Sequence, residues 1–248
     1  MHGANGRGAV TRATNGRVQF WPTGRMGTLY LVRHGQASFG ADNYDQLSPM
    51  GHRQALRLGE FWRARGMAFD AVYSGTLRRH DETLAGIVQG LGGAPQATRT
   101  PGLNEYDSLA LIRAIHPEPL ERPDTPEGYR HHFRLLCDAL AQWMAGVISP
   151  VGMSSWDEFA AGVHGALDEI RHTHAGRKVL LVSSGGPISA AVGEVLGTAP
   201  EVTIALNMRI RNSAVSEMSI SPKRLMLQTF NTLPHLNDIE HADWLTHA

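Results

Sequence analysis

Short apolar runs alternate with longer segments of helical periodicity along most of this 248-residue chain. Strands are expected around 29–32, 69–73, 96–100 and 179–183, and helices over about 49–66, 77–91, 126–148, 155–174 and 187–196. Strands that alternate with helices are typical of a mostly parallel sheet covered on both faces. Two further strands, around 213–220 and 225–231, are expected to form an antiparallel hairpin that closes one side of the sheet. The predicted fold class is therefore α/β.

Local signals mark where several of these helices begin and end. Ser48 precedes Pro49, and serine caps a helix well while proline suits its first turn. Ser155 and Glu158 have the spacing of a capping box. Gly92 is expected to end the second predicted helix, because glycine readily adopts the left-handed conformation that closes many helices.

Composition argues against several classes of function. Hydrophobic residues make up 42% of the chain, and no run approaches the roughly 18 apolar residues that cross a bilayer. Lysine plus arginine balance aspartate plus glutamate at 23 each, so no overall attraction to nucleic acid or to a membrane surface is expected. Cys137 is the only cysteine, which excludes an intramolecular disulfide and fits a cytoplasmic location.

The chain is expected to form one domain over 28–248, because nothing resembling a linker divides it. Residues 1–27 are rich in Gly, Arg, Thr and Asn, contain no acidic residue and show no sustained periodicity. They are interpreted as a disordered leader or as a misassigned start, with Met26 as the alternative first residue. No oligomeric state follows from the sequence.

The first predicted strand ends in a motif that suits phosphate chemistry. Residues 31–38 read LVRHGQAS, so Arg33, His34 and the flexible Gly35 follow the apolar run. Open α/β sheets keep their ligands at the carboxyl ends of their strands. A guanidinium holds an anion in a planar fork, while a neighbouring imidazole nitrogen can attack or stabilise phosphorus. Taken alone, the motif is equally compatible with a histidine that merely ends a strand.

Three later segments place further polar groups where strands end. Residues 73–83 read YSGTLRRHDET, in which a small-residue turn opens a helix that carries Arg78 and Arg79. Backbone donors at a helix start point at an anion, and adjacent helical residues face about 100° apart, so one arginine is expected to face the site. Glu105 follows the third predicted strand and suits acid/base work on a phosphoester. Residues 179–189, VLLVSSGGPIS, read as strand, glycine turn and helix.

Other catalytic motifs are incomplete. Ser183 and Ser184 lack the G-x-S-x-G elbow of a serine hydrolase, because Leu181 occupies the first glycine position. A nucleotide-binding P-loop is absent, since no Gly-Lys-Ser/Thr occurs. The paired histidines of the chain lack the carboxylates or cysteines of a metal site, so neither a metal nor a cofactor is expected.

Taken in order, LVRHGQAS, YSGTLRR, LNEY and VSSGGPI resemble the motifs of the histidine phosphatase superfamily, the phosphoglycerate mutase-like proteins. The resemblance covers about 28–236. It implies a three-layer αβα sandwich with a mostly parallel central sheet and an antiparallel strand near one edge, and a phosphohistidine mechanism. It also implies residue roles: His34 as nucleophile, Arg33 and Arg79 as phosphate clamps, Glu105 as acid/base, and Asn43 as a further phosphate contact.

One position departs from the family pattern. The family's second catalytic histidine falls on Ser184, and the resemblance places Ser184 and Gly185 against the substrate. The missing imidazole normally helps to hold the transferring phosphoryl oxygens. Losing a charge-assisted hydrogen bond costs about 1.5 to 3 kcal/mol, roughly ten- to a hundredfold in rate, unless water or the serine hydroxyl substitutes. Activity is therefore expected to be weakened without being abolished.

The leading interpretation is a phosphatase that hydrolyses a phosphomonoester through a phosphohistidine intermediate. The alternatives are a phosphoglycerate mutase-like phosphotransferase and a catalytically impaired phosphate-ligand-binding or regulatory protein. The substrate is expected to be a phosphorylated small molecule or a phosphoprotein. A helical lid over about 105–175 is expected to select it, with Arg113, His116 and Arg130 as candidate contacts or as exposed surface, while His235 receives no role.

Overall fold

The computed structural model describes residues 26–38, 45–118, 120 and 125–247. Residues 1–25 of the predicted leader and the predicted phosphate contact Asn43 lie outside these described residues, so the expectations for them stay predictions. Across the described ranges, no helix has both the length and the apolar character that a membrane crossing requires.

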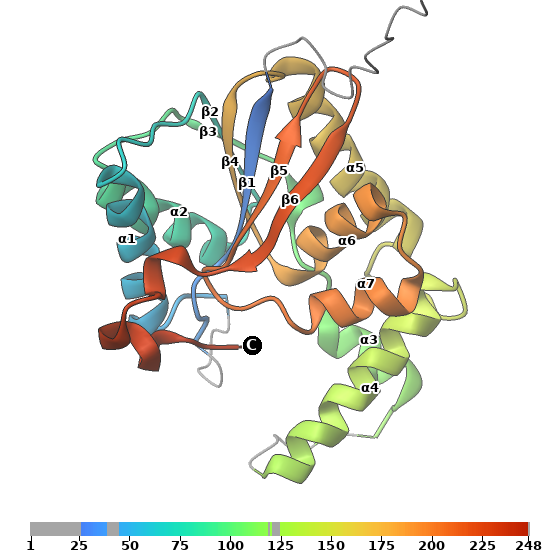
Figure 1. Ribbon diagram of the computed structural model, residues 1–248. Coiled ribbons are helices and arrows are strands. Elements are labelled where there is room, and N and C mark those ends of the chain that lie inside the picture. Colours follow the sequence, from blue (N-terminus) through green and yellow to red (C-terminus); the bar gives the residue numbers. More distant parts are fainter. Residues whose placement is uncertain (1–25, 39–44, 119, 121–124, 248) are drawn as a thin grey trace, which may run out of the picture.

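Within the described part of the chain, a six-stranded sheet forms the centre (Figure 1). Its strands are β1 (Gly27–Arg33), β2 (Ala71–Ser74), β3 (Ala97–Arg99), β4 (Lys178–Ser183), β5 (Val215–Ile220) and β6 (Leu225–Thr232). They lie in the order β3-β2-β4-β1-β5-β6. Strands β3, β2, β4 and β1 are parallel, and β5 is antiparallel to both of its neighbours. The structure therefore confirms the predicted α/β class and the antiparallel hairpin at one edge.

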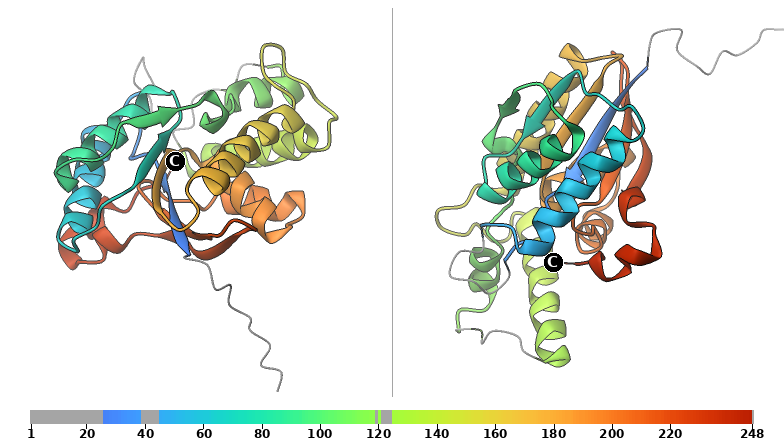
Figure 2. Two further views of the ribbon diagram at one scale, coloured as in Figure 1. Left: turned by 90° about the horizontal axis from the view of Figure 1, so that it is seen from above. Right: turned by 90° about the vertical axis from the view of Figure 1, so that its left-hand side faces the viewer.

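Helices cover both faces of this sheet (Figure 2). They are α1 (Pro49–Arg63), α2 (Arg78–Leu91), α3 (Ser108–Ile115), α4 (Pro126–Met144), α5 (Trp156–Thr173), α6 (Gly185–Leu196) and α7 (Pro200–Asn207), with the 3₁₀ turns η1 (Pro101–Leu103), η2 (Pro234–Leu236) and η3 (Ile239–Trp244). Helices α1 and α2 pack together on one face, and α5 and α6 pack on the other. This arrangement is the three-layer αβα sandwich that the resemblance implied.

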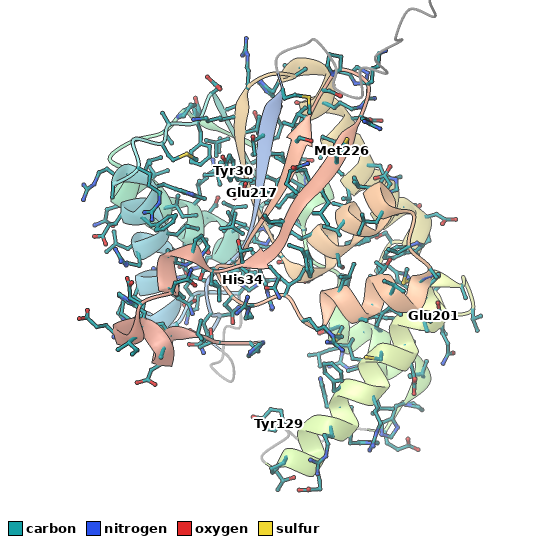
Figure 3. The ribbon with its side chains drawn as sticks, viewed as in Figure 1. Tyr30, His34, Tyr129, Glu201, Glu217 and Met226 are labelled. Atoms are coloured by element: carbon teal, nitrogen blue, oxygen red, sulfur yellow. The ribbon has the colours of Figure 1, made fainter. Side chains whose placement is uncertain are left out.

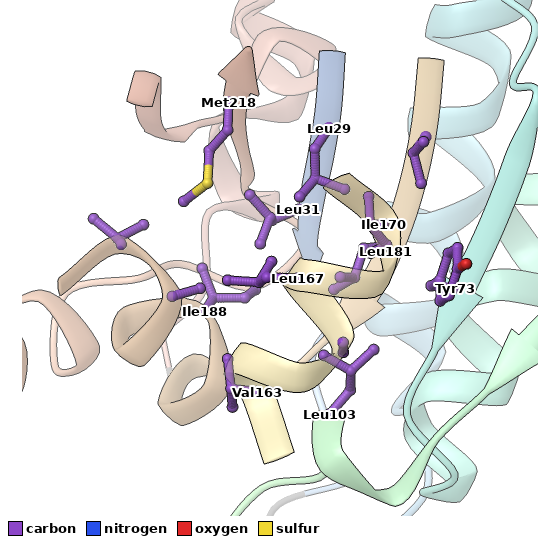
Figure 4. Packing of buried hydrophobic residues seen from close by; sticks show 14 of the residues in the cluster. Leu29, Leu31, Tyr73, Leu103, Val163, Leu167, Ile170, Leu181, Ile188 and Met218 are labelled. Carbon is purple, nitrogen blue, oxygen red and sulfur yellow. The ribbon is translucent and has the colours of Figure 1, made fainter. Parts of the chain in front are cut away.

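The two faces of β1 explain how one strand supports both helical layers. Leu29 and Leu31 point toward α5 and α6, where they join Leu167 and Ile188 in one apolar cluster (Figure 4). Val32, the next residue, points the opposite way into the cluster beneath α1 and α2. Successive strand residues face opposite sides of a sheet, so a strand buried on both faces needs an apolar run without polar interruption.

The helix ends follow their sequence signals. The Ser48 hydroxyl accepts a hydrogen bond from the Gly51 N–H at 3.1 Å, and Ser155 and Glu158 form the predicted capping box. Gly92 ends α2 in the left-handed conformation, with a φ of 88°. Helices α3 and α7 lie outside the predicted set, because at eight residues each they give too short a periodic pattern.

The predicted lid over 105–175 divides into two parts. Helix α5 buries Leu167 and Ile170 against the sheet and so belongs to the sandwich itself. Helices α3 and α4 instead pack on each other around Trp143, in a separate apolar cluster, and α4 extends beyond the end of the sheet (Figure 1). A lid function therefore stays a prediction for α3 and α4 only.

Replacing Leu31 by alanine tests how much the apolar cluster between the sheet and α5 and α6 contributes to stability. The Leu31 side chain is 1% exposed, and removing a buried leucine side chain costs about 2–5 kcal/mol through lost burial and the cavity left behind. We expect the free energy of unfolding, measured in urea, to fall by that amount. Leu109 on α3 is 52% exposed, so Leu109→Ala is the matched control, with an expected loss below about 1 kcal/mol. Equal losses in the two variants would contradict this account of the core.

Candidate active site

His34 directly follows β1 and lies at the carboxyl edge of the sheet (Figure 3). Its backbone N–H donates to the Ser183 carbonyl at 2.8 Å, which extends the contact between β1 and β4 by one residue. Its Nδ1 lies 2.7 Å from the Gly35 carbonyl oxygen. Because a carbonyl only accepts, Nδ1 carries the proton of the neutral ring, and Nε2 keeps a lone pair that can attack phosphorus.

Burial keeps the His34 ring neutral. The residue is 3% exposed, and this burial is the largest cause that holds the pKa of His34 well below the usual 6.5. The charges of Arg33 and Arg79 lower the pKa further, while the hydrogen bond to the Gly35 carbonyl opposes the shift. A neutral imidazole is a nucleophile, whereas a protonated one is not.

Two buried arginines act electrostatically on the His34 ring. Arg33, the last residue of β1, donates to the Ile210 carbonyl, and Arg79, in the first turn of α2, donates to Asp45 at 2.8 Å. Each arginine is 7% exposed. The positive charges of both arginines act on the His34 ring and lower its pKa.

Arg78 faces away from this cluster, although it is adjacent to Arg79. Its Nε donates to Glu82 at 2.7 Å, one helical turn further along α2, and its side chain is 55% exposed. Neighbouring residues on a helix point about 100° apart, so α2 presents only one of the two arginines to His34.

Glu105 lies in the segment that follows η1 and contacts the first turn of α6. Its Oε2 accepts a hydrogen bond from the Gly186 N–H in the first turn of α6, at 3.1 Å. Burial raises the pKa of the Glu105 carboxyl, while the Gly186 N–H and the charges of Arg79 and Arg33 oppose that rise. The net direction is upward, so the carboxyl keeps its proton to a higher pH than an exposed glutamate, as a general acid requires.

Glycine in the first turn of α6 allows this close approach. A Cβ atom on Gly186 would lie 2.1 Å from Glu105 Oε1, and one on Gly185 would lie 2.6 Å from Asn207 Oδ1. Helix α6 begins at Gly185, so the predicted glycine turn with a helix from 187 was wrong. The first N–H groups of a helix have no partner within it, so the Gly186 N–H can bind an acceptor outside the helix, here Glu105.

Ser184, the residue before α6, contacts a histidine without a predicted role. His80 on α2 places Nε2 2.7 Å from Ser184 Oγ, and both residues are fully buried. The ring centroids of His34 and His80 are 5.9 Å apart. Burial, and after it the charge of Arg79, lowers the pKa of His80 to about 3, so its ring is neutral.

One sequence signal could have singled out His80. On α2 it shares the buried face with Thr83, Leu84 and Ile87. A titratable residue on a largely apolar helical face is a candidate for a buried functional group. In the sequence, however, Arg78 and Arg79 stand directly before His80 and are the more conspicuous candidates for binding an anion.

A second buried histidine supports the chain behind His34. His235 in η2 is 1% exposed, and its Nε2 lies 3.0 Å from Ser213 Oγ. The Ser213 N–H in turn donates to the His34 carbonyl at 3.1 Å. Burial is the main cause that lowers the pKa of His235 to about 3. His235 is thus linked to the His34 backbone through Ser213.

Arg113, His116 and Arg130, the candidate contacts for a second anionic group, lie on or directly after α3 and on α4. His116 and Arg130 each contact a nearby acidic side chain, and Arg113 is exposed. Tyr129, which precedes Arg130, lies at the end of α4 away from His34 (Figure 3). A role for these residues in binding substrate therefore stays a prediction.

The cluster has the parts needed to transfer a phosphoryl group to and from an imidazole. It combines a neutral ring with an available nitrogen, two guanidinium charges that can hold an anion, and a carboxyl group with a raised pKa. No three potential metal-ligating side chains gather anywhere in the described ranges. Fold and site together define an α/β protein with a buried cluster of imidazole, guanidinium and carboxyl groups at the carboxyl edge of its sheet.

Comparison with known proteins gives the family. The model of the Histidine phosphatase superfamily (branch 1) matches residues 29–233, and the chain belongs to this superfamily. A probable phosphoglycerate mutase GpmB of Klebsiella pneumoniae (strain 342) is 27% identical over 221 residues, which are 87% of this chain and 94% of the relative. A metal-independent phosphoserine phosphatase of Arabidopsis thaliana is 24% identical over 217 residues, 85% of this chain and 84% of that protein.

A solved structure shares the fold. The native structure of a mycobacterial glucosyl-3-phosphoglycerate phosphatase matches with a TM-score of 0.60 and 21% sequence identity. The match covers 84% of this chain and 100% of that chain. The superfamily thus includes relatives named as mutases and relatives named as phosphatases, on one common architecture.

The buried histidines are expected to make stability depend on pH. In the folded protein, the pKa values of His34, His80 and His235 all lie below the usual 6.5. As pH falls from about 6.5 toward about 3, the unfolded chain therefore binds protons that the folded protein does not. The free energy of unfolding should decrease in this window, by up to about 1.4 kcal/mol per pH unit for each histidine, and should be insensitive to these groups above it.

Urea unfolding at about pH 7, pH 6 and pH 5 measures this dependence. His235→Asn should give a shallower loss of stability than the unmodified protein, because one of the three groups is removed. His52 is 53% exposed, so His52→Asn is the control and should leave the slope unchanged. A slope that is the same in all three proteins would show that burial of His235 does not govern its protonation.

Proposed function

We propose that this protein is a phosphatase that hydrolyses a phosphomonoester through a phosphohistidine on His34. One observation carries the proposal: the His34 ring is neutral, and the Nδ1 contact with the Gly35 carbonyl leaves Nε2 as the available nitrogen. The guanidinium groups of Arg33 and Arg79 lie around the same ring, where they supply positive charge for a bound phosphoryl group.

In the first step, His34 Nε2 attacks phosphorus in line with the leaving oxygen. The N–P bond forms while the P–O bond to the leaving group breaks, and Glu105 gives its proton to the departing oxygen. The raised pKa of Glu105 keeps that proton in place until it is needed. Arg33 and Arg79 neutralise the charge that is spread over the other phosphoryl oxygens.

In the second step, water attacks the phosphohistidine. Glu105, now a carboxylate, takes a proton from the water as the new O–P bond forms and the N–P bond to His34 breaks. Inorganic phosphate is released, and both side chains return to their starting protonation states. No electron transfer is involved, and the two arginines remain charged throughout because a guanidinium group does not lose its proton in proteins.

A phosphoglycerate mutase-like transfer is the alternative reaction, and one relative carries such a name. A mutase must protect its phosphoenzyme from water while the intermediate reorients, and the replacement of an imidazole by Ser184 makes that control harder. The third candidate, a phosphate-binding or regulatory protein, has no need of the complete set of His34, Glu105 and two arginines. The set as a whole therefore favours a phosphatase.

The substrate is proposed to be a phosphorylated small molecule. The relatives named a phosphoserine phosphatase and a glucosyl-3-phosphoglycerate phosphatase support this class. A phosphoprotein is the second candidate. We propose that α3 and α4, which extend past the sheet edge, select the substrate.

A phosphoenzyme trap tests the proposal. The protein is incubated with a ³²P-labelled aryl phosphate and quenched in alkali, and we expect label that is stable to base and labile to acid, as a phosphoramidate is. The label should be absent in His34→Asn and strongly reduced in Arg79→Gln, because the clamp is lost. Arg78→Gln is the matched control, since Arg78 is exposed and paired with Glu82. Absence of both label and turnover in the unmodified protein would rule out the phosphatase.

Gly186→Ala tests the position of Glu105. The added Cβ would lie 2.1 Å from Oε1, so the carboxyl must move away from the place where it meets the leaving oxygen. General acid catalysis typically contributes about 10²–10⁴-fold, and we expect kcat for the aryl phosphate to fall by roughly 100-fold. Gly165 in α5 has no atom within 4 Å of an added Cβ, so Gly165→Ala should keep full activity. Equal activities would mean that Glu105 is not held by this contact.

A further inference from the structure

A hydrogen bond joins two fully buried polar side chains, His80 on α2 and Ser184 directly before α6. His80 Nε2 lies 2.7 Å from Ser184 Oγ. The Ser184 hydroxyl makes no capping bond to α6, although serine commonly caps a helix in this position. The hydroxyl is therefore held by the imidazole instead of by the helix.

Ser184 lies next to the nucleophile. The His34 N–H donates to the Ser183 carbonyl, so Ser184 is the first residue beyond the point where β1 and β4 are joined. The ring centroids of His34 and His80 are 5.9 Å apart, and the charges of Arg33 and Arg79 act on the His34 ring. A phosphoryl group on His34 would therefore lie near His80 and its partner Ser184.

The tautomer of His80 decides what the Ser184 hydroxyl can do. With the proton on Nδ1, a buried N–H would have no partner among the described residues, which is rare in folded proteins. With the proton on Nε2, the ring donates to Ser184 Oγ and only a nitrogen lone pair is left without a partner. The second arrangement has the lower free energy, because no buried N–H is left without an acceptor. It also leaves the hydroxyl proton of Ser184 available for another acceptor.

We propose that His80 and Ser184 form a donor relay, in which His80 Nε2–H donates to Ser184 Oγ and the Ser184 O–H donates to a phosphoryl oxygen on His34. Ser184 is then the residue that touches the substrate, and His80 is a positioning residue that acts through it. The relay rests on the proposed phosphatase function. It assigns to His80 and Ser184 the hydrogen bond to the transferring phosphoryl oxygens that the family's second histidine normally makes. Hydrogen bonds in such a chain strengthen one another, since each donor is polarised by the next.

The local packing is arranged around the His80 ring. A Cβ atom on Gly75 would lie 2.2 Å from His80 Nδ1, so the ring fits only because glycine stands at that position. The Ser184 side chain points at the same ring, because His80 Nε2 lies 2.7 Å from Ser184 Oγ, so a larger side chain extended in that direction would meet the ring.

The ring works as a neutral donor in this relay. Burial and the Arg79 charge lower the pKa of His80 to about 3, so the ring adds no third positive charge beside the two guanidinium groups. A neutral, prearranged donor still stabilises the charge that develops on phosphoryl oxygens, and removing one such donor from a transition-state site typically lowers the rate about 10²–10³-fold.

A double-mutant cycle tests whether His80 acts through Ser184. With the aryl phosphate as substrate, Ser184→Ala should lower kcat/KM about 100-fold. His80→Ala should lower it roughly tenfold, because one hydrogen bond in the chain is lost while the hydroxyl remains. The double variant should be no slower than Ser184→Ala alone. Losses that multiply in the double variant would overturn the relay.

Conservative replacements separate positioning from a general structural role. His80→Gln places an amide N–H near the position of Nε2 and should restore most of the activity that His80→Ala loses. His80→Asn, whose shorter side chain reaches only toward the position of Nδ1, is the matched control and should not. Equal activity of the Gln and Asn variants, at equal stability in urea, would overturn the proposal. So would a gain of activity by Ser184→His in the presence of His80.

Binding of orthovanadate, which mimics the transferring phosphoryl group, separates failure of the relay from failure of the proposed function. If the unmodified protein binds vanadate but gives neither turnover nor label, the phosphatase assignment fails, and the relay is still judged by the variants. Vanadate should then bind more weakly to His80→Ala and Ser184→Ala than to the unmodified protein. Unchanged affinity in both variants would overturn the relay, and a complete lack of vanadate binding by the unmodified protein would overturn both proposals.

Discussion

The hydrogen bond from the His34 N–H to the Ser183 carbonyl is the contact on which the candidate site depends. It joins the carboxyl ends of β1 and β4, two neighbouring parallel strands from distant parts of the chain. Parallel strands end at the same edge, so this one junction sets His34 beside Ser184 and beside the first turn of α6. In that turn the Gly186 N–H donates to Glu105, which places the proposed acid at the same sheet edge as the proposed nucleophile.

Loss of solvation gives these groups their chemistry. Burial is the largest cause of the lowered pKa of His34 and of the raised pKa of Glu105, so one ring is kept neutral while one carboxyl retains its proton. Arginine cannot lose its charge in this way. The buried guanidinium group of Arg79 instead forms an ion pair with Asp45. The same environment therefore favours a neutral imidazole and a proton-retaining carboxyl group beside fixed positive charge.

Much of the architecture could be read from local patterns, because each pattern reflects a short-range physical requirement. The run from Leu29 to Val32 must be apolar throughout, since β1 is covered on both faces. Ser48, Ser155 and Gly92 satisfy backbone groups within a few residues of themselves, so their effects on helix ends need no distant partner. The start of α6 was placed two residues late, since Gly185 and Gly186 usually indicate a turn and here enter the helix to accommodate side chains from other segments.

The sequence by itself determined the α/β class, the order of strands and helices, and the residue types gathered for phosphate chemistry, because periodicity and motif order are properties of the chain alone. Only the tertiary structure decided which side chains share a space. It turned Arg79 inward and Arg78 outward, and it brought His80 to Ser184 from a segment 104 residues away. A pairing of this kind follows from how α2 and α6 pack around the strand ends, and no local pattern encodes it.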